Sequence, residues 1–391
     1  MIRLVPLSLL ALVLVPAAVA SARTADGCPP SSCGAQSVTF AGSRLLYVRP
    51  SGAIGPLVAY DLASGKRRFG LKSGLLSADG SRFFSARPAA AGTGIARYET
   101  TAGRRVGGWS TPGRWWLAGI SANGRWLALA ASEPGRGMTR LAVLSTDRRH
   151  VVRTLPLRGW WEVETVSNDG KRLFLIQHLR TSYVVRLYDV AKGALRPGSL
   201  KIKGESSQMV GSAWGSVGSP DGNWFLTLYI KGDGQSAFVH ALDLQRAYAR
   251  CLDLPTGDKP DFASMSQYVF VLSRDGMTLY AANPVLGIVA KLDLAQGKVV
   301  QTTRFGGAPS PGGAPATAAI GAMSHDGRTI YFSNGGAIWA YDAAFGRVRG
   351  PYAAGRIAGM GFSLDDRRLY VVRTAGSVAA LDAATGGVLK G

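Results

Sequence analysis

The sequence predicts an all-β fold, a β-propeller of four-stranded antiparallel blades, from three observations. One turn motif recurs seven times along the 391 residues, a second turn motif recurs eight times, and strand-forming runs separate them. Repetition at a fixed period predicts an array of stacked units rather than two or three separate domains. Hydrophobic residues make up 47% of the chain, which is enough for a large core. Eight in-phase repeats favour eight blades.

The first motif is Ser-x-Asp-Gly followed by a strand. Asp can hydrogen-bond its own backbone and Gly accepts a positive φ, so the pair forms a turn. The runs that follow, such as 172–176 and 224–230, are rich in aromatic, Leu and β-branched residues, which favour strands. The seven copies begin at Ser77, Ser121, Ser167, Ser219, Ser273, Ser324 and Ser363, and a degenerate eighth spans 40–47.

The second motif is apolar-Asp-apolar-x-x-Gly, and its Gly turns the chain into a fourth strand such as 298–302. Its best copies span 60–65, 188–193, 292–297 and 381–386, and weaker ones begin at 98, 144, 242 and 341. A lone four-stranded sheet could not bury both apolar faces, so the sheets must stack, and a closed ring removes the open ends.

The number of blades depends on the two ends of the repeat array. The first unit (37–71) and the last (357–391) each supply four candidate strands, which favours eight blades. If either unit were split to close the ring, seven blades would remain, and that alternative stays open.

The N-terminus predicts export. Arg3 precedes an apolar run over 4–20, and small residues suitable for cleavage follow at 18–22, so we expect a signal peptide over 1–22. A Cys-containing linker (23–36) and the propeller (37–391) follow. We therefore expect a secreted or cell-envelope protein with no integral membrane segment after cleavage. A lipid anchor at Cys28 is the rival, but the apolar residue expected three places earlier is missing.

Three cysteines are present, with neither the number nor the spacing of a zinc site. The separation of Cys28 and Cys33 favours a local disulfide, which would leave Cys251 free and buried. The alternative pairs one N-terminal cysteine with Cys251.

The chain is strongly basic, with 45 Lys and Arg against 24 Asp and Glu and a net charge of +21. The basic residues are scattered, which is typical of a solvated, Arg-rich surface. They would also attract an anionic envelope polymer, lipid headgroups or a polysaccharide. No nucleic-acid-binding motif is present, so we expect no nucleic-acid partner.

The repeats resemble the YVTN-type and WD-like propeller repeats of exported bacterial proteins. The best matches are 273–283 and 363–372, and the resemblance covers 37–391. It implies the propeller fold, and it implies little about function because this fold hosts many activities.

The chain offers few groups suited to catalysis. The histidines His150, His178, His240 and His325 fall in different repeats, and none has metal-binding spacing. His325 lies in a turn, so we expect it to be solvated. About half of the carboxylates occupy the two turn motifs. We therefore predict no catalytic residue, metal or cofactor.

The strand before each Ser-x-Asp-Gly turn should line the central channel. Counting back from the marker serines places aromatic residues at the mouth of this channel. Their rings could stack on sugar rings while a carboxylate and an Arg bind hydroxyl groups; alternatively, they pack between blades. The candidate ligand-binding residues are Arg114, Trp115, Trp116, Trp161, Glu162, Trp214 and Tyr268.

These features favour a monomeric, non-catalytic binding or interaction module, for a cell-envelope glycan or for a protein partner. The alternative is a propeller enzyme of the lactonase or quinoprotein-dehydrogenase kind, since 381–386 resembles a quinoprotein repeat. The closing Trp of that repeat is missing at 388–390, and the adjacent cysteine pair of quinoprotein alcohol dehydrogenases is absent.

Overall fold

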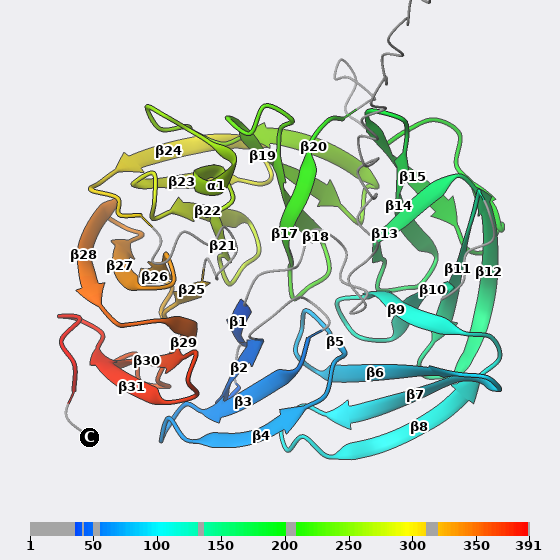
Figure 1. The fold of residues 1–391 in the computed structure, drawn as a ribbon, viewed down its shortest axis with the longest axis horizontal. Helices are drawn as coiled ribbons and strands as arrows, with labels where there is room; N and C mark the ends of the chain where they lie inside the picture. The colour runs from blue at the N-terminus through cyan, green and yellow to red at the C-terminus, as the bar shows by residue number, and fades with distance from the viewer. Residues whose placement is uncertain are drawn as a thin grey trace, which may run out of the picture.

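The protein folds into a ring of eight antiparallel sheets. The computed structural model describes residues 36–40, 43–49, 55–131, 137–200, 209–309 and 320–389. The predicted signal peptide, Cys28 and Cys33 lie outside these residues. Each sheet is one blade built from consecutive strands, and the blades follow one another around a central axis (Figure 1). The prediction of eight blades is confirmed, and the seven-blade alternative is wrong.

The first four blades span the N-terminal half of the chain. Blade 1 contains β1 (Gln36–Thr39), β2 (Leu45–Arg49), β3 (Leu57–Asp61) and β4 (Arg67–Leu71). Blade 2 contains β5 (Leu75–Leu76), β6 (Arg82–Ala89), β7 (Gly92–Glu99) and β8 (Arg105–Thr111). Blade 3 contains β9 (Trp115–Ile120), β10 (Trp126–Ala131), β11 (Met138–Ser145) and β12 (His150–Arg158). Blade 4 contains β13 (Trp160–Val166), β14 (Arg172–His178), β15 (Tyr183–Asp189) and β16 (Ala194–Leu195).

The remaining blades follow in the same order. Blade 5 contains β17 (Ser212–Gly218), β18 (Trp224–Ile230), β19 (Ala237–Asp243) and β20 (Tyr248–Asp253). Helix α1 (Phe262–Met265) precedes blade 6, which contains β21 (Val269–Leu272), β22 (Thr278–Asn283), β23 (Ile288–Asp293) and β24 (Lys298–Arg304). Blade 7 contains β25 (Ile320–Met323), β26 (Thr329–Ser333), β27 (Ala337–Asp342) and β28 (Arg347–Ala353), and blade 8 contains β29 (Ile357–Phe362), β30 (Arg368–Arg373) and β31 (Val378–Asp382).

Blade 8 differs from the four-strand prediction. Its sheet has three strands, and the fourth segment is reduced to a single bridge between Leu381 and Val388. The turn that begins at Asp382 extends to Gly387, whose carbonyl accepts a hydrogen bond from the Asp382 N–H. Few described residues then remain to pair with β31.

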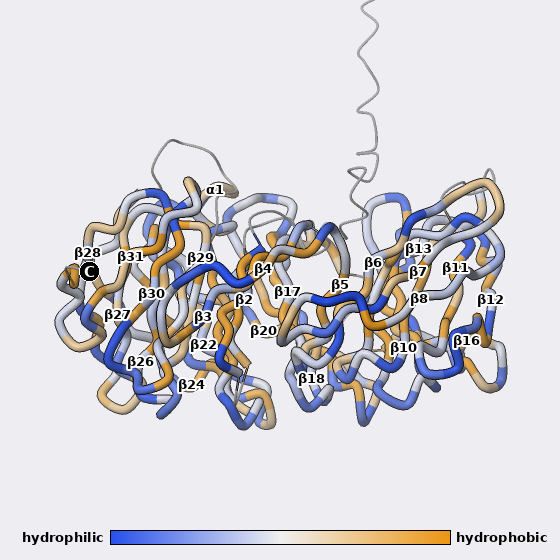
Figure 2. Tube along the Cα trace, turned by 90° about the horizontal axis from the view of Figure 1, so that it is seen from below, coloured by the Kyte–Doolittle hydropathy of each residue, from blue (hydrophilic) through white to orange (hydrophobic). Residues whose placement is uncertain are grey.

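The core consists of apolar layers between neighbouring blades. Leu228 and Val239 of blade 5, for example, pack with Leu279 and Leu292 of blade 6, and all four are fully buried. Burying one such side chain contributes about 2 kcal/mol relative to leaving it exposed. Seen edge-on, the ring is a flat disc whose hydrophobic stretches run through the strands (Figure 2). Strands that are covered on both faces explain the near-continuous apolar runs of the sequence.

The ring closes where blade 8 meets blade 1. Leu46 and Val48 of β2 pack with Tyr370 and Val372 of β30. The Tyr370 hydroxyl donates to the Ala63 carbonyl at 2.9 Å. No sheet of the described chain mixes strands from the two ends, so this closure depends on contacts between complete blades.

The eight inner strands share one direction through the disc, because each is the first strand of its blade. They begin on one side of the disc, which we call the start face. The Ser-x-Asp turns follow them on the opposite side, which we call the turn face. The inner strands are β1, β5, β9, β13, β17, β21, β25 and β29.

Neighbouring turns on the turn face bond to one another. The Asn123 N–H donates to Asn168 Oδ1 at 2.9 Å, which joins blades 3 and 4. His325 makes a similar link between blades 7 and 8, because its Nδ1 lies 2.6 Å from Asp366 Oδ1. The expectation that His325 is solvated is therefore wrong. Asp366 stands where the other copies have Gly, and its carboxylate reaches the neighbouring turn.

Two further expectations concern membrane spans and Cys251. The described residues contain a single helix, which has four residues, so no helix among them is long and apolar enough to cross a membrane.

The expectation that Cys251 is buried is wrong, because its side chain is exposed. It lies on β20, the outermost strand of blade 5, which neighbours a blade whose outermost strand, β16, has only two residues.

Candidate functional site

Two consecutive blade junctions on the start face repeat the same local structure. The sequences are Gly-Arg-Trp-Trp over 113–116 and Gly-Trp-Trp-Glu over 159–162. Each glycine has a positive φ, +89° at Gly113 and +93° at Gly159, which an L side chain would adopt only with strain. Each turns the chain from the outer strand of one blade into the inner strand of the next.

The first junction is held by buried groups. The Thr93 hydroxyl donates to the Gly113 carbonyl at 2.8 Å and accepts from the Trp115 N–H at 2.8 Å. The Trp115 indole is 4% exposed, and its Nε1 donates to the Pro112 carbonyl at 2.7 Å. With its polar atoms satisfied, this junction is a rigid support for the residues on either side of Trp115.

The second junction repeats these bonds. The Thr139 hydroxyl donates to the Gly159 carbonyl at 2.8 Å and accepts from the Trp161 N–H at 3.1 Å. Trp161 is buried, and its Nε1 donates to the Arg158 carbonyl at 2.7 Å. We call the two junctions the twin supports.

Each twin support presents the residues before and after its buried tryptophan. The first presents Arg114 and Trp116, and the second presents Trp160 and Glu162. The Trp116 side chain is 39% exposed and Trp160 is 52% exposed. Two indole rings are thus offered to solvent at the starts of neighbouring inner strands.

Polar groups lie beside the exposed Trp160 ring. It stacks on the His178 imidazole with the ring centres 3.9 Å apart and an angle of 18° between the planes. Nε2 of that histidine lies 3.2 Å from Glu162 Oε2, and both side chains are mostly buried. The stacked imidazole holds the indole in place, and the partly accessible Glu162 carboxylate lies near the edge of this aromatic surface.

The other predicted residues have different surroundings. Tyr268 is buried, its hydroxyl donates to the Pro255 carbonyl, and burial raises the pKa of its phenol. Trp214 is half-buried on β17 and meets the Phe262 ring edge-on at 5.3 Å. Of the seven predicted residues, Arg114 and Trp116 are exposed at the twin supports, Glu162 is mostly buried against His178, and Trp115 and Trp161 serve as packing within the supports.

Several residues of this site are not among the seven predicted from the sequence. Trp160 was missed because the count back from the marker serine stopped one residue short of it. The duplication of Gly-x-Trp-x at 113–116 and 159–162 was visible in the sequence and could have identified it. His178 and the buried Thr93 and Thr139 carry no local signal, because they reach the site from other strands.

A second polar cluster lies between blades 4 and 5. Glu164 Oε1 accepts from the Thr227 hydroxyl at 2.8 Å and lies 3.5 Å from His240 Nδ1. The Glu164 side chain is 4% exposed and His240 is fully buried. The pairing of β13 with β14 shifts register at Glu164, and such a bulge redirects a side chain. The bulge turns the carboxylate toward blade 5.

Tyrosine hydroxyls extend this cluster outward. Tyr183 of blade 4 stacks on Tyr229 of blade 5 with ring centres 5.0 Å apart. Burial, reinforced by the nearby Glu164 carboxylate, raises the pKa of Tyr229, and burial also raises that of Tyr183. Both phenols therefore stay neutral at ordinary pH.

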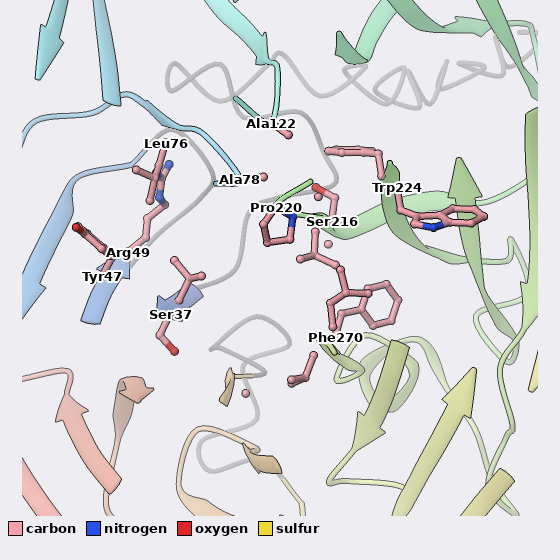
Figure 3. A pocket seen from close by; sticks show the side chains of 18 of the residues that line it. Ser37, Tyr47, Arg49, Leu76, Ala78, Ala122, Ser216, Pro220, Trp224 and Phe270 are labelled. Carbon is pink, nitrogen blue, oxygen red and sulfur yellow. The ribbon is translucent and has the colours of Figure 1, made fainter. Parts of the chain in front are cut away.

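The inner strands surround a cavity of about 600 Å³ on the axis of the ring. Its wall includes Ser37 of β1, Ser216 of β17 and Phe270 of β21 (Figure 3). Trp214 and Glu164 also line it. Among the described residues no group of three or more His, Cys, Asp or Glu is placed to hold a metal ion.

Comparison with known proteins identifies the architecture. No protein-family profile and no curated protein match the sequence. Among solved structures, the dihydro-heme d1 dehydrogenase NirN in complex with DHE matches with a TM-score of 0.53 and 15% identity, over 89% of this chain and 72% of NirN. The Dos1 propeller (TM-score 0.50, 12% identity) matches over 90% of this chain and 92% of its own. The computationally designed Ika8 protein (TM-score 0.50, 12% identity) matches over 90% and 96%. At such identities only the fold is shared, and this fold supports both enzymes and non-enzymes.

Proposed function

We propose that this propeller is a carbohydrate-binding module that holds its ligand on the start face, over the twin supports. One observation carries the proposal: two neighbouring blade junctions with the same buried bonds present the exposed rings of Trp116 and Trp160, the second of which stacks on His178 near Glu162. A flat apolar ring with polar groups at its edge complements a sugar, whose ring carries an apolar C–H face and equatorial hydroxyls.

The rigidity of the twin supports favours binding. A preorganised site loses less conformational entropy when the ligand arrives. The predicted export adds the location: we propose a glycan of the cell envelope as the ligand, with the protein acting outside the cytoplasm as a monomer.

The first test is binding of the purified protein to a panel of soluble polysaccharides by affinity electrophoresis and calorimetry. Trp116→Ala and Trp160→Ala should each weaken binding about tenfold, because each removes a stacking surface worth about 1.4 kcal/mol. Circular dichroism should stay unchanged, since both rings are exposed.

Phe345→Ala provides the matched control. This ring is 75% exposed in the turn between β27 and β28, on the turn face. Its loss should leave binding intact. Full binding by the Trp116→Ala, Trp160→Ala double variant would refute the proposed function.

A further inference from the structure

The start face is strongly basic around the twin supports. Exposed basic side chains lie at the strand ends and junctions of blades 2 to 4. They are Lys72 after β4, Arg87 at the end of β6, Arg114 before β9, Arg158 at the end of β12 and Arg180 after β14. We call this region the basic sector.

The backbone links three of these residues to the proposed glycan site. Arg114 is the second residue of the first twin support. Arg158 immediately precedes the second, and its carbonyl accepts the Trp161 Nε1 bond. Arg180 lies in the loop that begins after His178, on which Trp160 stacks. These three positive charges therefore lie close in the chain to the residues that carry or contact the exposed indole rings.

Exposed carboxylates of the same face gather elsewhere. Asp233 and Asp253 lie at the strand ends of blade 5, and Asp258 and Asp261 lie in the segment before α1. Within the basic sector the described carboxylate is Glu162, which faces His178. Over blades 5 and 6 these carboxylates alternate with Lys231, Lys259 and Arg304, and Asp253 pairs with Lys231 at 3.0 Å. The start face is therefore positive over blades 2 to 4 and close to neutral over blades 5 and 6.

We propose that the ligand is an acidic polysaccharide, with sugar rings over Trp116 and Trp160 and carboxylates on the arginines of the basic sector. This inference rests on the proposed function. Guanidinium groups pair with carboxylates in a two-pronged geometry that a neutral glycan cannot use.

An anionic lipid surface shares this charge but fits the face less well. Leu179 is 39% exposed beside Arg180, but the two indole rings are held on rigid supports, and the Glu162 carboxylate lies near Trp160 through His178. A carboxylate pressed against anionic headgroups would be repelled and partly desolvated. Over a sugar, the same carboxylate accepts a hydroxyl hydrogen bond.

The test compares polygalacturonate fragments with the same fragments after their carboxylates are reduced to alcohols. Calorimetry at about 20 and about 150 mM NaCl separates the charge contribution, because exposed ion pairs are screened at the higher salt. We expect the acidic fragments to bind roughly tenfold more tightly than the reduced ones at the higher salt. Arg158→Gln with Arg180→Gln should remove most of that difference.

Two controls make the outcomes distinct. Lys171→Gln with Arg367→Gln removes two exposed charges from the turn face and should change nothing. Phosphatidylglycerol vesicles test the lipid surface. Equal binding of acidic and reduced fragments would overturn the acidic ligand but leave the proposed function standing. Binding of neither fragment would overturn both, as would capture by vesicles alone.

Discussion

The serine of the Ser-x-Asp turn makes the same bonds in every copy. Its hydroxyl donates to the Asp (or Asn) side chain two residues later at 2.5 to 2.8 Å. It also accepts from the backbone N–H five residues later at 2.8 to 3.0 Å. The motif recurs because each turn needs both bonds to connect the inner strand to the next.

These bonds predict a dependence of stability on pH. The serine hydroxyl is the main cause of the lowered pKa at Asp275, Asp326 and Asp365, whose usual value is 3.8. A pKa lowered by folding contributes stability that is present above the unfolded value and is lost as the pH falls through the folded value. We therefore expect the midpoint temperature of thermal unfolding to drop as the pH is lowered below about 3.8, because these aspartates then become protonated.

Ser273→Ala tests the cause, because it removes the bond to Asp275. The variant should start less stable at neutral pH and lose less on acidification than the parent, as measured by urea unfolding from neutral pH to below pH 3. An acid loss identical to that of the parent would contradict this assignment.

Single residues also show where sequence reasoning stops. The Ser-x-Asp turn is local chemistry, so its spacing predicts the repeat directly. Asp366 occupies the glycine position of the Ser363 copy in blade 8 with φ +56°, and its carboxylate accepts from the backbone of His325 and Asp326 in the neighbouring blade. Those bonds join residues about forty positions apart, and nothing near His325 in the sequence indicates them.

At the scale of elements, the twin supports explain which tryptophans face solvent. In each pair one indole donates to a nearby carbonyl and is buried, so its neighbour points the other way. Counting back from the marker serines identified the correct strands but not the direction of each ring. The β-bulges fall at Ala118 and Glu164, three residues before their serines, but at Trp214, five before its serine. Equal counts therefore give equal orientations in blades 3 and 4 but not in blade 5.

Thr139→Val tests the second twin support. The substitution keeps the shape but leaves the buried Trp161 N–H without its acceptor, at a cost of about 1 to 3 kcal/mol in unfolding free energy. Glycan affinity should also fall, because Trp160 and Glu162 lose their fixed positions.

The matched control is Thr154→Val on the exposed side of β12. Chemical denaturation and calorimetry should show no change for this variant. If Thr139→Val lowered stability without lowering affinity, the support would be structural only.

Some of the many arginines lie on the outermost strands of the blades and bond to the neighbouring blade. Arg153 of β12 donates from Nε to the Val190 carbonyl at 3.1 Å, and Arg250 of β20 donates to the Ala295 carbonyl at 3.4 Å. Both reach the second turn motif of the following blade, where the guanidinium groups pack against Gly193 and Gly297. These arginines join blades, so they belong to the structure rather than to the binding surface.

At the scale of the whole molecule, stability depends on the closure between blades 8 and 1. A Cβ added at Gly359 would lie 2.6 Å from Val48 Cγ2, closer than atoms can approach. Gly359→Val should therefore push the two blades apart and cost about 1 to 3 kcal/mol or more. Thermal unfolding and proteolysis should both detect the loss.

Gly306→Ala is the control, since an added Cβ there meets nothing within 4 Å. It should leave the thermal midpoint almost unchanged. An unchanged midpoint in Gly359→Val as well would mean that the closure adds little to the stability of the ring.

The architecture could be predicted from the sequence because the two turn motifs and the strand-forming runs between them recur along the whole repeat array. The four-strand prediction for blade 8 treated the segment after Gly387 as a strand, but its described residues pair with β31 only at Val388 and Leu389. The cluster of Glu164, Thr227 and His240 could not be predicted, because it joins three strands of two blades.

Because each sheet comes from one uninterrupted stretch of chain, the disc is modular at the level of the gene. Duplicating or deleting the segment between two successive blade junctions would add or remove a complete blade without cutting any sheet. The closure would need to adapt only in the angle at which complete blades meet. A change of ring size is therefore a single genetic step for this protein, and a tandem duplication of 113–158 would also lay a third aromatic support beside the existing two.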